Sequence, residues 1–330
     1  MQSAKVKPSL LPYAVALAIL IVNLIFDLLS IYRAMHMHST SGDDSIHQVA
    51  LYMMLGSEFG AMVLSVVLGF ACTQWLLERR RIAGLPGYAA VCIGATYAVL
   101  SVALTFSLWF ITQAVSKHFG DIGMHMMVIV NVIVGRVITL LAVALPVWLI
   151  FRLLRKREIP VLHSVELRWR ALLIFTMFVW AWVLVILQLG LPVALSLGST
   201  YETDQGLFLL QGYMGSFVLV LPAFLGAWVG LPRTMPHTRV LRLLLTSVLA
   251  LVVCALAMVI VTYVMVRMGG AFIDDFEPGQ GFSALVALVW FIVSIPLCGF
   301  LVRLLTRKQA PLVPYGNVTV LEGESGFSRS

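Results

Sequence analysis

Long runs of apolar residues alternate with short polar segments along the whole chain. A helix satisfies its own backbone hydrogen bonds, and about 20 apolar residues in a helix cross the hydrocarbon core of a bilayer. Eight runs reach this length and predict spanning helices at residues 9–33, 50–77, 87–115, 123–154, 169–198, 206–230, 238–267 and 281–305. We therefore predict an all-α fold, a polytopic transmembrane helical bundle of about eight spans.

The composition agrees with this prediction. The chain is 61% hydrophobic and 11% charged, whereas soluble domains carry roughly 25% charged residues. Lipid is therefore expected to cover most of the surface, and no room remains for a soluble catalytic domain. The net charge of +7 does not indicate nucleic-acid binding, because the basic residues gather at the ends of the apolar runs. The predicted partners are membrane lipids and no nucleic acid.

The positions of the basic residues predict the orientation of the chain. Arg33, Lys117 and Arg267 are the three that fall on the loops of one side, and Arg136 lies inside a predicted span. The other 18 of the 22 Lys and Arg residues fall on the opposite side, at Lys5, Lys7, Arg79, Arg80, Arg81, Arg152, Arg155, Lys156, Arg157, Arg168, Arg170, Arg233, Arg239, Arg242, Arg303, Arg307, Lys308 and Arg329. Because cytoplasmic loops are enriched in Lys and Arg, we predict a multi-pass protein of a bacterial inner membrane with both termini in the cytoplasm.

Two similar segments suggest a tandem repeat. Arg-Leu-Leu begins at Arg152 and again at Arg303, an offset of 151 residues, and each lies at the end of the fourth span of a set. A Gly-Leu-Pro also follows the second span, at 84–86, and another follows the sixth span, at 230–232. We predict a 4+4 parallel repeat, with modules at residues 1–160 and 161–308 related by an axis along the membrane normal, and a flexible cytoplasmic tail at 309–330. The alternative is chance similarity among leucine-rich helices.

Glycine pairs indicate close helix packing. Gly56 with Gly60, and Gly226 with Gly230, each have the spacing G-x-x-x-G that lets helix backbones approach one another. The pattern fits both packing within one chain and a homo-oligomer.

Ionisable residues inside spans are the first functional candidates, because charge is costly in hydrocarbon. Three lie well inside the predicted spans, away from their ends: Asp27, Glu58 and Arg136, all in the first half of the chain. Asn23 and Asn131, each about one turn from one of them, extend a predicted intramembrane polar network. The functional interpretation is an ion or proton pathway or a polar pocket. The structural interpretation is a fixed ion pair that sets helix register, with Glu58 reaching toward the outer surface.

Methionine and histidine residues cluster on the predicted outer side of the first half. The candidate metal ligands are Met35, His36, Met37, His38, Met124 and His125. Thioether and imidazole groups suit Cu(I), so copper is the candidate ion. The alternative is that these are ordinary membrane methionines and solvated histidines.

No catalytic motif is found. The chain lacks H-E-x-x-H, G-x-x-x-x-G-K-[ST] and G-x-S-x-G, so we predict no enzyme activity. Repeated modules, proline-containing helices and intramembrane charges favour a transporter or permease-like protein for a small solute, ion or lipid-like molecule. The alternatives are a non-catalytic accessory or scaffold subunit of a membrane complex, and metal handling at the outer face.

Overall fold

Eight long helices make up most of the described chain in the computed structural model, which describes residues 9–38, 44–118, 124–160, 167–196, 205–232, 235, 238–269 and 280–306. The helices are α1 (Leu11–His38), α2 (Asp44–Arg80), α3 (Tyr88–His118), α4 (Met124–Leu153), α5 (Arg168–Ser196), α6 (Gln205–Gly230), α7 (Val240–Gly269) and α8 (Gln280–Thr306). A 3-10 turn, η1 (Arg155–Arg157), and two short strands, β1 (Ile82–Gly84) and β2 (Ile159–Pro160), complete the described elements. The predicted all-α bundle of about eight spans is confirmed.

The helices have the length and apolarity of membrane spans. Seven of them are long and apolar enough to cross a bilayer, and the described part of α6 adds a shorter apolar segment, Val220–Gly230. Many large apolar side chains point outward, among them Val91, Val229 and Val259. Such a surface is stable in contact with lipid and costly in water. The chain is therefore a multi-pass helical membrane bundle.

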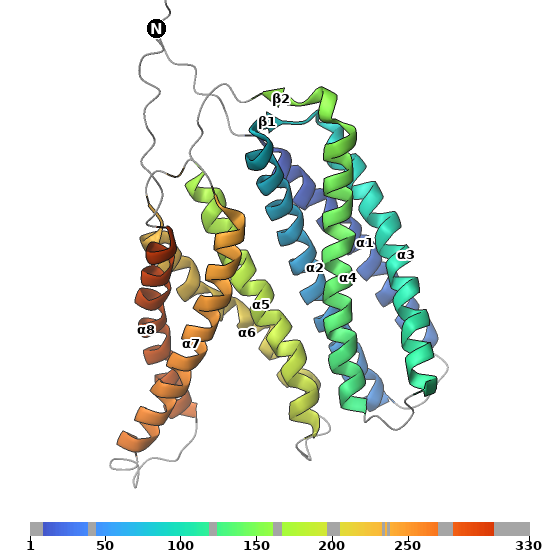
Figure 1. Cartoon of the computed structure of the whole chain (residues 1–330). Helices are drawn as coiled ribbons and strands as arrows, with labels where there is room; N and C mark the ends of the chain where they lie inside the picture. The colour runs from blue at the N-terminus through green and yellow to red at the C-terminus, as the bar shows by residue number, and fades with distance from the viewer. Residues whose placement is uncertain are drawn as a thin grey trace, which may run out of the picture.

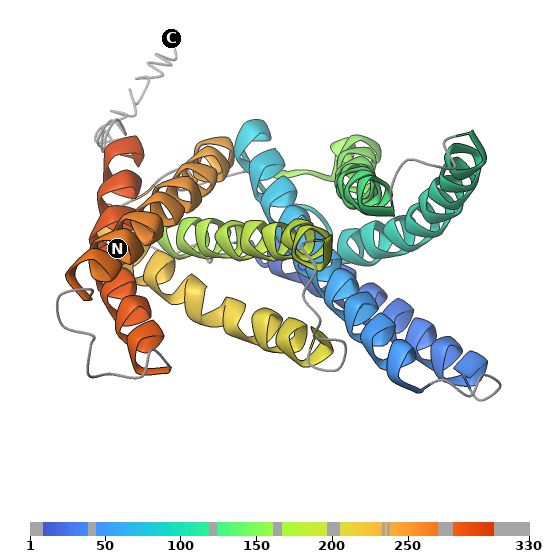
Figure 2. The ribbon, with the colours of Figure 1, turned by 90° about the horizontal axis from the view of Figure 1, so that it is seen from below.

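The two halves have the same order of helix neighbours (Figure 1). In the first half α1 packs on α2 and α3, and α4 packs on α2 and α3. In the second half α5 packs on α6 and α7, and α8 packs on α6 and α7. Helices α2 and α4 join the halves through contacts with α5, and α2 also contacts α6. The view from below shows α2 crossing the end of α5 (Figure 2). A tandem duplication would produce this order, and the duplication itself stays a prediction.

Helices α6 and α8 approach at backbone distance. A β-carbon built on Gly226 would lie 2.6 Å from the Cβ of Cys298 and 2.6 Å from the carbonyl oxygen of Ile295. One turn later, Gly230 faces the backbone of Gly299 on α8. The second glycine pair therefore serves packing within the chain. Pro222 and Pro296 lie inside the same two helices.

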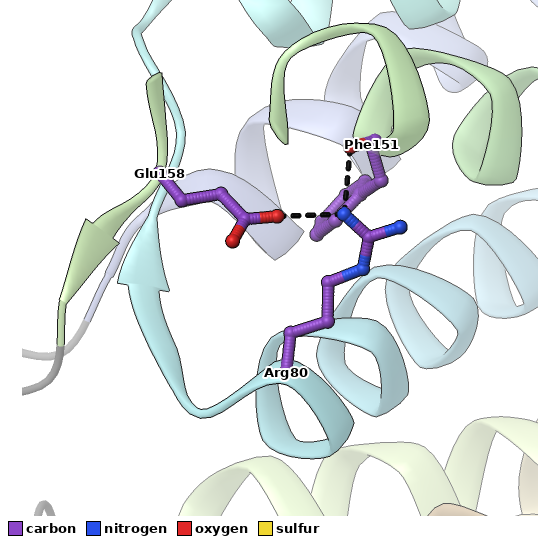
Figure 3. Close-up of polar contacts among 3 residues, drawn as sticks. All are labelled: Arg80, Phe151 and Glu158. Carbon is purple, nitrogen blue, oxygen red and sulfur yellow. Dashed lines mark hydrogen bonds and ion pairs between the residues drawn. The ribbon is translucent and has the colours of Figure 1, made fainter. Parts of the chain in front are cut away.

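A small cap covers one end of the first four helices. Strand β1 pairs antiparallel with β2, next to the end of α2. Arg80 Nη1 lies 2.6 Å from the carboxylate of Glu158 and donates a 2.8 Å hydrogen bond to the carbonyl of Phe151, near the end of α4 (Figure 3). These bonds fix the end of α2 against the end of α4. We name this end of the bundle the basic face, because the ends of α2, α4 and α8, the turn η1 and the starts of α5 and α7 bring their arginines there.

Candidate functional site

Asp27 and Glu58 are brought together by the packing of α1 on α2. The charge of Asp27 acts on Glu58, and Ser30, one turn after Asp27, lies within hydrogen-bonding reach of the Glu58 carboxyl. Both acids are half-buried in the middle of long apolar helices. Oε2 of Glu58 is fully buried and has no hydrogen-bond partner among the described residues. The pair is therefore an acidic centre in which one carboxyl oxygen has no hydrogen-bond partner among the described residues.

Arg136 on α4 meets Gln188 on α5. Its Nη2 donates a hydrogen bond to Oε1 of Gln188, whose side chain is 4% exposed. Gly60 on α2 makes room for this amide, because a β-carbon there would lie 2.5 Å from Gln188 Nε2. Gln188 is 20 residues after Arg168 at the basic face, so this contact lies about 30 Å away along α5 at 1.5 Å per residue. Three helices, two from the first half and one from the second, thus meet at the Arg136–Gln188 contact, toward the end of the candidate spans opposite the basic face.

Helix α2 lies between the acidic pair and the Arg136–Gln188 contact. Glu58 and Gly60 are two residues apart, which turns them by about 200° around the helix axis. Glu58 accordingly faces α1, and Gly60 faces Gln188 of α5. The structure thus places Asp27 beside Glu58, and it shows a hydrogen bond from Arg136 to the neutral side chain of Gln188. A direct ion pair between Arg136 and either acid stays a prediction. The Asn131 side chain lies outside the described residues.

Asn23 forms its own network between three helices. Its Nδ2 donates to Ser65 Oγ on α2 at 2.8 Å and to the Ile19 carbonyl at 3.0 Å, and its Oδ1 accepts a 2.8 Å bond from the hydroxyl of Tyr97 on α3. The Asn23 amide is therefore fully engaged in helix packing, one turn from Asp27. Its role is to hold α1, α2 and α3 in register on the side of the acidic pair that faces the basic face.

Tyr97→Phe tests this network. The change removes the hydroxyl donor to Asn23 Oδ1 at a side chain that is 4% exposed. Hydrogen bonds between membrane helices contribute about 0.6 kcal/mol on average and up to roughly 2. We expect a loss of about 1 kcal/mol in the free energy of unfolding, measured in detergent. Tyr263→Phe, at an exposed position on α7, is the control and should change it by less than about 0.3 kcal/mol.

A second polar cluster, which we name the junction cluster, lies at the basic face between the halves. Arg170 at the start of α5 is 5% exposed; its Nη1 donates to Gln74 Oε1 at 2.7 Å, and its Nη2 donates to the carbonyl of Ser9. The guanidinium also lies over the ring of Tyr13, 5.6 Å from the centroid. One buried cation therefore binds the start of α1, the end of α2 and the start of α5.

The junction cluster continues to α7 through Glu78. Its Oε1 accepts bonds from Gln74 Nε2 at 2.8 Å, from the Thr238 backbone amide at 2.9 Å and from the Thr238 hydroxyl at 2.5 Å. Beside it, the Leu167 amide donates to the Met235 carbonyl at 3.0 Å. The first half is thus hydrogen-bonded to the start of α7 as well as to α5.

Sequence reasoning missed several of these residues. It treated Arg170 and Arg80 as determinants of orientation only, and it did not single out Gln74, Glu78 or Gln188. A usable signal did exist, because Gln188 is an amide inside an apolar run and Gln74 and Glu78 lie four residues apart at the end of another. Polar groups in such positions are costly unless they are paired.

The predicted metal site cannot be placed. Helix α1 ends at His38 and α4 begins at Met124, so both segments occur at helix ends, but the side chains of Met35, His36, Met37, His38, Met124 and His125 lie outside the described residues. Among the side chains that are described, no group of three or more His, Cys, Asp or Glu residues could hold a metal ion. All four cysteines are free thiols, and Cys254 and Cys298 have their sulfur atoms 3.4 Å apart between α7 and α8.

Comparisons with models of protein families, with curated proteins and with solved structures give no match. The function is therefore argued from the geometry of the helices and their polar contacts.

Proposed function

We propose that the protein is a transporter or permease-like membrane protein that moves a small solute, ion or lipid-like molecule, with Asp27 and Glu58 as its ion-binding pair. The observation that carries this proposal is the buried Oε2 of Glu58, which lacks a donor among the described residues and lies beside a second acid. A cation or a proton donated there would supply the missing partner.

Electrostatics supports this role for the two acids. Two carboxylate charges on packed helices repel each other strongly where little water screens them. Binding of a proton or a cation relieves this repulsion, and loss of the ion restores it. Packing of α1 on α2 would then depend on whether the site is loaded, which is the coupling that a transport cycle needs. Ionisable groups inside membrane bundles commonly mark ion pathways.

The Arg136–Gln188 contact provides the second support. It lies where α2 and α4 of the first half meet α5 of the second, and transporter sites commonly lie at the interface between repeats. The guanidinium and the amide offer hydrogen-bond donors for a polar solute. A solute bound there would contact both halves and so respond to their relative movement.

We further propose that the basic face lies in the cytoplasm of a bacterial inner membrane. Tryptophan rings at this face carry stacked arginines, with Arg152 5.2 Å from the Trp148 ring centroid and Arg168 5.7 Å from that of Trp228. Aromatic rings of this kind concentrate at membrane–water interfaces, and arginines on the cytoplasmic side.

Accessibility from both sides of the membrane tests the transport proposal. In a variant whose native cysteines are replaced, Ser30→Cys places a thiol beside Glu58. A membrane-impermeant thiol reagent is expected to label this residue both in right-side-out and in inverted vesicles, because an alternating site opens to each side in turn. Ser216→Cys is the control; this α6 side chain is fully buried and contacts Trp180, so it should stay unlabelled from both sides.

Absence of labelling from either side would contradict transport and favour an accessory or scaffold subunit whose buried charges are closed to water.

The variant Arg136→Gln separates the transport interpretation from the structural one further. If the guanidinium is a fixed structural element, the variant should be lost from the membrane. If it belongs to a transport site, the variant should reach normal abundance and keep the helical content of the parent.

A further inference from the structure

A cavity opens at the basic face where the end of α2 meets the start of α7. It has a volume of about 180 Å³ and is lined by Trp75, Arg239, Val240, Leu241 and Arg242. The cavity is lined by residues of both halves of the chain, and it lies well away from Asp27, Glu58 and Arg136, which are near the middle of the helices or beyond. It is therefore separate from the proposed transport site.

The charge around this cavity is positive. Arg239 and Arg242 line it, and Arg79 lies above the Trp75 ring, 5.0 Å from the centroid. The arginines of the lining lie at the start of α7, where the helix dipole is also positive, so an anion bound there would be stabilised by both. Within the described parts of the chain, none of these arginines forms an ion pair.

The nearby acid, Glu78, belongs to the junction cluster, where its charge acts on the buried guanidinium of Arg170. Among the described residues, Glu78 forms no ion pair with Arg239 or Arg242. The arginines of the cavity lining, Arg239 and Arg242, can therefore bind an external ligand. Arginine forms strong, charge-assisted hydrogen bonds to phosphate oxygens.

The apolar surface beside the cavity favours a lipid as the source of the phosphate. Leu241 is in the cavity lining and is 66% exposed, and Leu245 (64%) and Leu249 (40%) continue the same helix face at four-residue spacing. Side chains four residues apart lie along one face of a helix, so these leucines form an apolar stripe that runs from the cavity into the membrane. Acyl chains would cover this stripe, whereas a free phosphate would not.

We propose that this cavity binds the headgroup phosphate of an anionic phospholipid, with Arg239 and Arg242 as phosphate ligands, Trp75 at the headgroup level and the α7 leucines against the acyl chains. Basic pockets between spanning helices are suited to anionic headgroups. The lipid would contact α2 and α7 together and so add to the connection between the halves.

Native mass spectrometry of the purified, delipidated protein tests this site. Phosphatidylglycerol is expected to bind more tightly than phosphatidylcholine with the same acyl chains. Arg239→Gln with Arg242→Gln should weaken the binding of phosphatidylglycerol by about tenfold, and the corresponding double lysine variant should keep most of it. Arg152→Gln with Arg155→Gln is the matched control, since Arg152 stacks on Trp148 at the same face but lines no part of this cavity. The affinity of this control variant for phosphatidylglycerol should stay within about twofold of that of the parent.

Equal loss in both glutamine variants would overturn the proposal, because it would show general attraction to a basic surface. Equal binding of the two lipids would also overturn it. Inorganic phosphate that binds as tightly as the lipid would identify a free anion and contradict the lipid assignment. If the glutamine variant does not fold, the unmodified protein can be cross-linked to a photoreactive phosphatidylglycerol. Cross-links at residues 75–79 or 239–245 would support the site, and cross-links elsewhere would contradict it.

Discussion

Gly226→Ala is expected to destabilise the second half of the protein by about 2 to 3 kcal/mol, the upper part of the usual range for overpacking. The added methyl group would lie 2.6 Å from the Ile295 carbonyl oxygen and 2.9 Å from the Gly299 amide nitrogen. Both atoms belong to the backbone of α8, so no side chain can rotate to relieve the overlap. Helices α6 and α8 must separate instead, and they lose the contacts that hold them.

Unfolding of the purified protein in mixed micelles, followed by circular dichroism, measures this loss. The matched control is Gly135→Ala in α4, where an added methyl group meets no atom within 4 Å. Alanine is also the better helix former, so the control should be as stable as the parent or slightly more stable. Equal stability of both variants would show that α6 and α8 do not pack through Gly226.

Arg170→Met is expected to cost about 3 kcal/mol. Methionine fills a similar volume but leaves Gln74 Oε1 and the Ser9 carbonyl without their donor in a buried position. Each unpaired buried acceptor costs roughly 1 to 3 kcal/mol, and Glu78 loses a nearby positive charge. Because the bonds of Arg170 connect the two halves, the variant should weaken the connection between them before the helices themselves unfold.

Limited proteolysis in the segment at 161–166 and the midpoint of thermal unfolding together measure this effect. Arg168→Gln, two residues away on the same helix, is the control: its bond to the Trp228 carbonyl is 2.6 Å long but exposed, so the loss should stay below about 1 kcal/mol. Arg170→Lys should lose less stability than Arg170→Met and more than Arg168→Gln, because an ammonium cannot reproduce the forked geometry of a guanidinium. Similar stability of all these variants would contradict a structural role for the junction cluster.

Run length was sufficient to predict the helices because a bilayer imposes it. Five of the eight predicted spans, those that correspond to α4 to α8, begin and end within two residues of the observed helices, and α3 ends three residues later than predicted. The larger differences occur in α1, which begins at Leu11 and continues to His38, and in α2, which begins at Asp44 and ends at Arg80. Apolarity defines the part of a helix that lies in hydrocarbon, whereas the helix can continue into the polar layer where charged and amide side chains are tolerated.

The polar site was only partly predictable, because the choice of partners depends on helix packing. Sequence alone identified Asp27, Glu58 and Arg136 as costly residues that need neighbours. It could not show that Glu58 faces α1 while Gly60, two residues later, faces Gln188, since rotation of α2 decides this. Charge counting similarly assigned Arg170 to one side of the membrane, but could not distinguish this buried arginine from exposed ones such as Arg152.

The contacts between the halves have a consequence for the number of sites per chain. Helices α2 and α4 pack on α5, but α6 and α8, which hold the corresponding places in the second half, do not pack extensively on α1 within the described residues. The interface is therefore heterologous, joining two different surfaces, and is not closed by a two-fold axis. A contact such as Arg136–Gln188 then occurs once, so the transport site proposed above is expected once per chain even though the helix order is repeated.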